Sequence, residues 1–384
     1  MKRQDRNREV VETPERVLRT AEQLNAAGII GEHDVASVTQ ISERFAVGIS
    51  PAMRRLINPM DPQDPIAAQF VPSALELKVV PEELADPIGD EPHSPIPGIV
   101  HRYPDRVLFK PVNACAVYCR FCFRRETVGK GLQGLDDEAI DRALHYIESR
   151  PEIWEVIVSG GDPFVLSARR LKALMRRLEK MEHLGVVRFH TRVPVVTPAA
   201  IDDELIDAIK INKAVYVVLH ANHPRELSTE ARRACAKLID SGFPMLSQTV
   251  LLKGVNADEK TLSSLFRALV AIRIKPYYLH HGDLAHGTAH FRTSISEGQD
   301  LMRSLKRNLS GLCQPNYVLD IPGGYGKVPI GPNYLNQISQ EGYEVCDIHG
   351  QLHAYGKTHE GSLAPAHADS NPLEVIGSHN HLSK

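Results

Sequence analysis

From Arg106 onward, short apolar runs alternate with amphipathic segments, whereas the first hundred residues show no such alternation. Six runs have the length and composition of buried strands: 106–112, 153–158, 186–192, 215–220, 244–251 and 274–280. Each is followed by a segment with helical periodicity. Strands that alternate with helices in this way predict repeated βα units and a parallel sheet.

The helical segments carry one apolar face each. In two of them the apolar positions repeat every three or four residues: Leu171, Leu174, Met175 and Leu178, then Leu262, Leu265, Phe266 and Leu269. Ser167 is predicted to cap the first helix. Asn256 is predicted to cap the second, with Glu259 as its reciprocal partner. Both helices should therefore pack on the sheet.

Parallel strands joined by helices close into a full or partial barrel, and the loops after the strand C-termini then meet at one mouth. We therefore expect an α/β fold of the partial (βα)6 type with a reactive site at that mouth. A Pro-rich connector, 86–98, ends the preceding region. The predicted parts are a helical N-terminal extension (1–100), the barrel (101–310), a C-terminal segment (311–359) and a disordered tail rich in Ser, His, Pro and Asn (360–384).

The 384 residues are 42% hydrophobic and 24% charged, which is typical of a soluble globular protein. The net charge of -2 argues against nucleic acid or an acidic membrane surface as the main partner. No apolar run approaches the roughly 20 residues that span a bilayer. The N-terminus lacks an apolar signal region, so a cytoplasmic location is expected.

Three of the six cysteines lie within eight residues, in Cys115-Ala-Val-Tyr-Cys119-Arg-Phe-Cys122, directly after the first predicted strand. Six cysteines are too few for a disulfide scaffold, so the cluster indicates ligation in a reducing compartment. Three thiolates can hold a 4Fe-4S cluster and leave its fourth iron open to a small molecule. A structural zinc site, for which no second cysteine pair is present, or three unrelated thiols would also account for the spacing.

Two glycine-containing segments also fall where ligands could bind. Ser159-Gly160-Gly161-Asp162-Pro163 ends the second predicted strand, where glycine lets the backbone approach a ligand, although a tight turn would need the same residues. Asp320-Ile-Pro-Gly-Gly-Tyr-Gly-Lys327 is predicted to be a loop too rich in glycine for regular structure. A lysine there could form a Schiff base with pyridoxal phosphate (PLP), or it could be a solvated lysine on a surface turn.

The C-x3-C-x2-C spacing followed by Phe123 resembles the radical S-adenosylmethionine (SAM) superfamily. Four segments resemble lysine 2,3-aminomutases in the same order: 115–122, 160–162, 282–293 and 322–327. The resemblance covers about residues 60–350. It implies a radical SAM barrel and an isomerase that uses a 4Fe-4S cluster, SAM and PLP, with electrons from a low-potential donor such as flavodoxin or ferredoxin.

The resemblance also implies roles for individual residues. The cluster would be held by Cys115, Cys119 and Cys122. SAM would be contacted by Gly160, Gly161, Asp162, His220 and Gln248. PLP would be bound to Lys327 and steadied by Arg102 and Arg106. The substrate carboxylate would be gripped by Arg124, and its distal ammonium by Asp283 and Asp320. The two aspartates would offset the desolvation of that ammonium, although Asp283 could also cap a turn and Asp320 could end a strand.

These roles predict migration of the α-amine of L-lysine to C3, giving β-lysine. A glutamate enzyme should not present two aspartates to the distal group, whereas arginine stays open because its guanidinium also suits two carboxylates. Relatives that modify a lysine on a translation elongation factor generally lack the aspartate pair. Two further functions stay open, namely a radical SAM enzyme without PLP and a zinc-binding interaction module without catalysis.

The remaining cysteines and histidines carry no ligand spacing. Cys235, Cys313 and Cys346 are predicted to be buried small hydrophobic residues. The C-terminal cysteine cluster that binds zinc in some family members is missing, so zinc is not predicted. His349, His353 and His359 are predicted to belong to a polar tail. The oligomeric state stays open, a homo-oligomer included.

Overall fold

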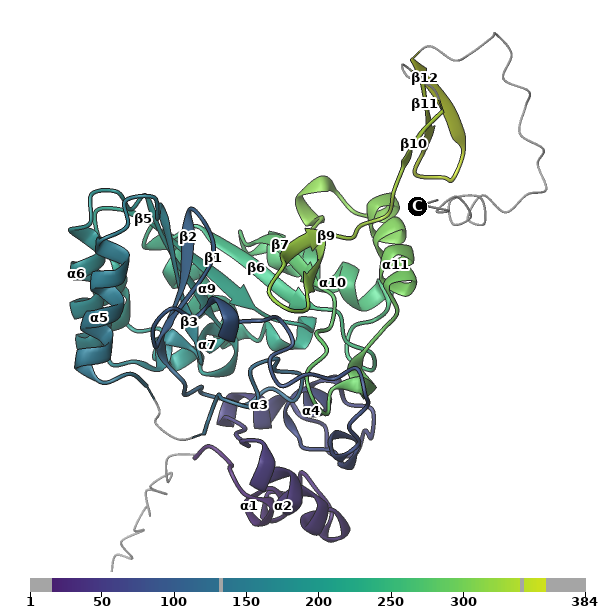
Figure 1. Ribbon diagram of the computed structural model, residues 1–384. Coiled ribbons are helices and arrows are strands. Elements are labelled where there is room, and N and C mark those ends of the chain that lie inside the picture. The colour runs from purple at the N-terminus through teal and green to yellow at the C-terminus, as the bar shows by residue number, and fades with distance from the viewer. Residues whose placement is uncertain (1–15, 131–133, 339–341, 357–384) are drawn as a thin grey trace, which may run out of the picture.

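The computed structural model describes residues 16–130, 134–338 and 342–356. A helical N-terminal region lies against one end of a large twisted sheet, and a small separate sheet stands near the C-terminal end (Figure 1). The predicted tail at 360–384 and His359 lie outside the described residues. No helix among those described is long and apolar enough to cross a membrane.

The main sheet has nine strands that are paired in chain order. They are β1 (Ile99–Tyr103), β2 (Arg106–Val112), β3 (Glu155–Gly160), β4 (Val186–Thr191), β5 (Ala214–His220), β6 (Met245–Val250), β7 (Lys275–His280), β8 (Asn316–Ile321) and β9 (Gly326–Pro329). Pairing is parallel from β2 to β8 and antiparallel at both ends. The sheet is a partial barrel, and the six predicted strands are confirmed with bounds within two residues.

Helices connect the parallel strands as predicted. They are α5 (Asp137–Glu148), α6 (Ala168–Glu179), α7 (Val193–Val196), α8 (Asp203–Ile209), α9 (Thr229–Asp240), α10 (Glu259–Ala271) and α11 (Ile295–Asn308). The predicted apolar faces of α6 and α10 are buried in the core.

The cap of α6 is confirmed, because Ser167 accepts from the backbone N–H of Arg170. The predicted cap of α10 is wrong, since Asp258 caps that helix. Asn256 is buried and accepts from the N–H of Leu252 at 2.8 Å while its own amide donates to two carbonyls. A side-chain amide both donates and accepts, so it can satisfy a buried turn in a way that a carboxylate cannot.

The glycine-lysine segment differs from the prediction. Only residues 322–325 form a turn, in which Gly323 and Gly324 adopt positive φ. Lys327 therefore lies on β9, paired directly with Asp320 of β8, so the expectation of an irregular loop at Lys327 is wrong. The backbone N–H of Lys327 donates to the hydroxyl of Tyr103 at the far end of the sheet, at 2.8 Å. The hairpin thereby links the last strands to the first.

The C-terminal sheet consists of β10 (Leu335–Gln337), β11 (Gly342–Cys346) and β12 (Leu352–Gly356). It stands apart from the main sheet (Figure 1). Cys235 and Cys313 are buried, as predicted. Cys346 is only half-buried because it lies on β11 of this small sheet, so that prediction is wrong.

The N-terminal region is formed by α1 (Ala21–Ala26), α2 (Val35–Arg44), α3 (Pro51–Leu56), α4 (Pro65–Phe70) and irregular segments, which confirms the helical extension for its described part. A buried carboxylate joins it to the cysteine loop. Glu76, in the 3-10 turn η2 (Ala74–Leu77), accepts from Arg120 Nε at 2.9 Å and from Arg125 Nη2. Burial alone would raise the pKa of Glu76, but the two arginines hold it below its usual range.

Replacing this carboxylate should destabilise the fold. Glu76→Gln leaves two buried guanidinium groups without their counter-charge, and we expect the free energy of unfolding to fall by about 3–5 kcal/mol. Urea unfolding measures the change. Glu82→Gln is the control, because Glu82 pairs with Arg292 from an exposed position and should contribute under about 1 kcal/mol. Equal, small losses in both variants would contradict the proposed importance of the buried contact.

Candidate active site

All fourteen residues that the sequence singles out as site residues line one cavity of about 360 Å³. They are Arg102, Arg106, Cys115, Cys119, Cys122, Arg124, Gly160, Gly161, Asp162, His220, Gln248, Asp283, Asp320 and Lys327. Most of them lie on the parallel strands or on the loops that follow their C-terminal ends, where a barrel places its reactive groups. The structure therefore brings these residues together, while their chemical roles stay predictions.

The cysteine loop follows β2 and turns its thiols toward the cavity. Cys115, Cys119 and Cys122 form no disulfide, and burial raises the pKa of each thiol, that of Cys122 to about 11. Cys119 Sγ accepts a hydrogen bond from Arg192 Nη1 at 2.8 Å. A positive partner stabilises a thiolate, which is the form that binds iron.

The donor set fits an iron-sulfur cluster. Among the described residues, no group of three or more His, Cys, Asp or Glu side chains is arranged to hold a single metal ion. A 4Fe-4S cluster takes each cysteine at a different iron atom and does not require that arrangement. Three thiols on one loop beside a cavity match what such a cluster needs.

The glycines at the end of β3 allow close contact with the cysteine loop. A Cβ at Gly161 would lie 2.1 Å from the carbonyl oxygen of Ala114, and Gly160 has a φ of +107°. The backbone N–H of Asp162 donates to that same Ala114 carbonyl at 2.9 Å. Glycine is thus required here for packing of the cysteine loop, whether or not a ligand also binds.

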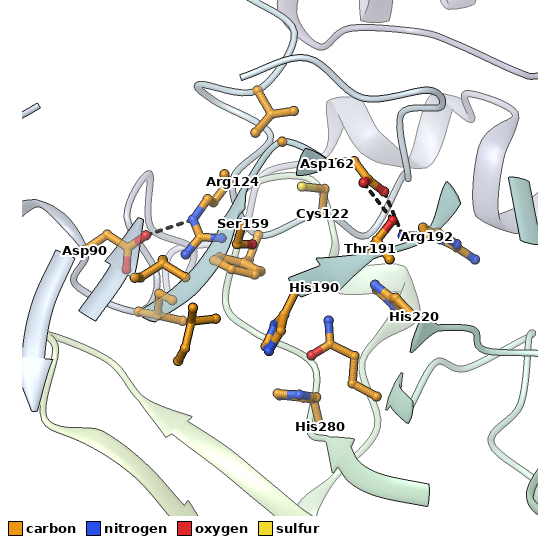
Figure 2. A pocket seen from close by; sticks show the side chains of 18 of the residues that line it. Asp90, Cys122, Arg124, Ser159, Asp162, His190, Thr191, Arg192, His220 and His280 are labelled. Atoms are coloured by element: carbon orange, nitrogen blue, oxygen red, sulfur yellow. Dashed lines mark hydrogen bonds and ion pairs between the residues drawn. The ribbon is translucent and has the colours of Figure 1, made fainter. Parts of the chain in front are cut away.

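The side chain of Asp162 is already occupied by the protein. Its carboxylate accepts from Thr191 Oγ1 and from the backbone N–H of Arg192, each at 2.7 Å, as Figure 2 shows, and from the N–H of Phe164. These bonds join the ends of β3 and β4. A ligand held by this segment would therefore be contacted through backbone atoms.

Three cations converge on Asp90, a residue of the N-terminal region. Its carboxylate accepts from Arg124 Nε at 2.8 Å (Figure 2). It also accepts from Arg102 Nη2 at 3.2 Å, and Lys110 Nζ lies 3.7 Å away. Burial would raise the pKa of Asp90, but the three cations hold it below its usual range. Asp90 was not predicted as a site residue because it lies in the Pro-rich connector, where neither periodicity nor a motif marks it.

Lys327 and the two aspartates form the other charged group of the cavity. Lys327 Nζ donates to Asp320 and lies 3.2 Å from Nδ1 of His280. Burial opposes ionisation of Asp320, yet His280 and Lys327 hold its pKa well below its usual range. Burial and the nearby charge of Asp320 raise the pKa of Asp283 to about 7. Among the described residues no group donates a hydrogen bond to the Asp283 carboxylate, so it faces the cavity without a partner.

Three further residues surround the cavity beside His220 and were not predicted: His190, Arg192 and His280 (Figure 2). All four lie at or just after strand C-termini, where a barrel places its reactive groups. Nε2 of His190 and of His220 is buried without a hydrogen-bond partner in the described part of the chain. Burial, and next to it the charges of nearby arginines, lowers the pKa of both imidazoles well below the usual range. Both can therefore bind a ligand as neutral groups.

The raised pKa of Asp283 predicts a pH-dependent cost to stability. The unfolded carboxyl ionises near 3.8 and the folded one near 7, so the folded state binds more protons between these values and loses stability as pH rises through them. Asp283→Asn removes this cost. Without added ligands, the variant should be more stable than the original protein by roughly 2–4 kcal/mol at pH 8, and by less than half of that at pH 5. Urea unfolding at both pH values checks this, and a variant that is less stable at pH 8 would contradict it.

Comparisons with known proteins agree with the motifs. The family described as the radical SAM superfamily matches residues 109–265, and the one described as lysine-2,3-aminomutase matches 302–379. L-lysine 2,3-aminomutase of Clostridium subterminale is 37% identical over 88% of this chain and 82% of its own length. A putative L-lysine 2,3-aminomutase of Aquifex aeolicus is 41% identical over 76% of this chain and 80% of its own. Glutamate 2,3-aminomutase of Clostridioides difficile is 37% identical over 78% and 70%.

Proposed function

The chain belongs to the lysine 2,3-aminomutase family of radical SAM isomerases, and from this premise we propose that it converts L-lysine to β-lysine with PLP. The family implies SAM and a 4Fe-4S cluster. The substrate proposal is supported above all by one observation: the carboxylate of Asp283, which has no hydrogen-bond donor among the described residues, lies in the same cavity as Asp320, Arg124 and Lys327.

The charges of the cavity suit the two ends of lysine. Arg124 offers a guanidinium to the α-carboxylate, and Asp283 with Asp320 offers negative charge to the distal ammonium. Lys327 is itself a primary ammonium on a four-carbon stem, and Asp320 accepts from its Nζ. The contact supports the proposal, because L-lysine would present the same group to the same carboxylate.

The residues present also fit PLP and the cluster. Lys327 would hold PLP covalently, Arg102 and Arg106 would offer positive charge to its phosphate, and the three loop cysteines would hold the cluster. When bound, the cluster supplies the electron that cleaves SAM, and PLP carries the amine that migrates. Attachment of PLP to Lys327 would remove the ammonium that pairs with Asp320. That carboxylate would then accept from the substrate's distal ammonium, until transfer of PLP to the substrate amine releases Lys327 again.

The two aspartates also favour lysine over glutamate as the substrate. The relative named glutamate 2,3-aminomutase has the same identity to this chain as the first lysine relative, so identity alone does not choose between them. A glutamate side chain would bring a third carboxylate against Asp283 and Asp320, and like charges in a buried site repel. Free arginine as a substrate would present a guanidinium that can also pair with both aspartates, so the assay below includes it.

We further propose a flavodoxin or ferredoxin as the low-potential electron donor and the cytoplasm as the location. Both agree with the use of an iron-sulfur cluster in a reducing compartment. A homo-oligomer is compatible with every feature of the cavity described above.

A substrate assay tests the aspartate pair. Protein reconstituted anaerobically with iron, sulfide and PLP, then reduced with dithionite and given SAM, is offered lysine, arginine or glutamate, and products are followed by NMR. We expect β-lysine. Asp320→Asn should lower kcat/KM for lysine by about 100-fold, because a charged hydrogen bond contributes about 3 kcal/mol.

Asp300→Asn is the control, since Asp300 is exposed on α11 and, within the described part of the chain, forms an ion pair with Arg303 alone. Its kcat/KM should equal that of the original protein. Unchanged lysine turnover in Asp320→Asn, or turnover of glutamate in preference to lysine, would refute the substrate proposal.

Covalent trapping tests the cofactor separately from turnover. Borohydride reduction after incubation with PLP should leave one pyridoxyl group on the original protein, located at Lys327 by mass spectrometry of peptides. Lys327→Ala should lose the label completely, since no other amine is proposed to hold PLP. Lys172→Ala, at an exposed position of α6, should keep it. A label that persists in Lys327→Ala, or an unlabelled original protein, would favour a PLP-free enzyme instead.

A further inference from the structure

Arg192 connects three parts of the molecule that are distant in sequence. It follows β4 directly, and its side chain is buried. Nη1 donates to Cys119 Sγ at 2.8 Å, and Nη2 donates to Glu226 Oε2 at 2.7 Å and to Gln69. One guanidinium thus joins a proposed cluster ligand, a buried acid and the N-terminal helix α4.

The partners of Arg192 are fixed in place. Glu226 is fully buried, and its second oxygen accepts from the backbone N–H groups of Asn222 and His223, each at 2.9 Å. Gln69 is also fully buried and donates to that same oxygen at 3.1 Å. These contacts leave the guanidinium little freedom to rotate away from the sulfur.

The surroundings of the guanidinium are apolar. The rings of Phe70 and Phe121 lie with their centroids 4.7 and 5.3 Å from the guanidinium carbon of Arg192. A charge acts more strongly where aromatic rings replace water, because the local dielectric constant is low. Arg192 therefore presents both a hydrogen bond and an incompletely screened positive charge to Cys119.

We propose that Arg192 is a positioning residue that raises the reduction potential of the iron-sulfur cluster through its hydrogen bond to Cys119. The inference rests on the proposed function only in placing the cluster on Cys119. Reduction adds one electron to the cluster, supplied by the external donor, and so increases the negative charge on its sulfurs. Hydrogen bonds to those sulfurs and nearby positive charge stabilise the reduced state.

A substitution at Glu226 can show whether Arg192 changes the reduction potential through its charge or through its packing against the cysteine loop. Its carboxylate partly offsets the charge of Arg192, so neutralising each residue should move the potential in opposite directions. Loosening of the cysteine loop would instead move both variants the same way. The two substitutions therefore distinguish an electrostatic role from a merely structural one.

The experiment is a redox titration of the reconstituted full-length protein, monitored by the electron paramagnetic resonance signal of the reduced cluster, without lysine. At the midpoint potential of the original protein, Arg192→Gln should lower the ratio of reduced to oxidised cluster by about tenfold. Glu226→Gln should raise that ratio. Arg225→Gln is the control, because Arg225 neighbours Glu226 and pairs with Asp64, the N-cap of α4, but does not contact the cysteine. It should leave the ratio unchanged.

Arg192→Lys keeps the charge without the planar fork and should give a smaller decrease than Arg192→Gln. If Arg192→Gln assembles no cluster, Arg192→Lys and Glu226→Gln carry the test. An unchanged ratio in the Arg192 variants, or shifts of one sign in Arg192→Gln and Glu226→Gln, would overturn the inference and leave the proposed function intact. Failure of the original protein to bind a cluster would instead refute the proposed function.

Discussion

The free-energy cost of removing charged side chains from water determines how the residues at the mouth of this barrel are paired. An ionised group that is buried must be paired, must shift its pKa or must wait for a charged ligand. Glu76 takes the first course with two arginines, and Asp90 does so with three cations. Asp283, which lacks a donor among the described residues, takes the second and holds its proton until near pH 7. A cationic ligand would allow this carboxyl to ionise fully.

The same cost explains what the N-terminal extension contributes. Glu76, Gln69 and Asp90 all come from it, and each contacts an arginine on the cysteine loop or at the end of β4. The loops that follow β2 and β4 present these cations at the mouth, and the extension supplies acceptors for them. Without the extension, buried arginines around the cysteines would be left unpaired, which is costly. The extension is therefore part of the site.

Local patterns in the sequence were sufficient for the six strands from β2 to β7 but did not predict β1, β8 and β9. The run at 106–112 coincides with β2 because a buried strand is marked by its own apolar residues and by the helix that follows. β8 and β9 carry a weaker signal, since Asp320 and Lys327 face each other across the hairpin in place of apolar pairs. The register that places them together depends on the turn at Gly323 and Gly324. The residue spacing in 320–327 did not predict that Asp320 and Lys327 would be paired across two strands.

A candidate site residue could be predicted when the residues that mark it lie close to it along the sequence. The cysteines and glycines belong to compact motifs, and His220 was predicted from the resemblance to the family. Asp90 was missed because its role depends on Arg102 and Arg124, which reach it only in the folded chain. Arg192 was missed for the same reason, since its three partners lie 34, 73 and 123 residues away along the sequence. Long-range pairing of charge is the part of this site that one sequence does not reveal.

The charged groups around Asp320 also constrain the order of steps in the proposed reaction. Its carboxylate accepts from the Lys327 ammonium, while His280, whose pKa burial and the charge of Lys327 lower, lies near both groups. A second ammonium from the substrate would compete with Lys327 for the same oxygen. Covalent attachment of PLP to Lys327 would occupy that amine, and transfer of PLP to the substrate's α-amine would release it again. In the proposed reaction the distal ammonium and the released Lys327 would therefore share Asp320, and Asp283 would supply the second negative charge.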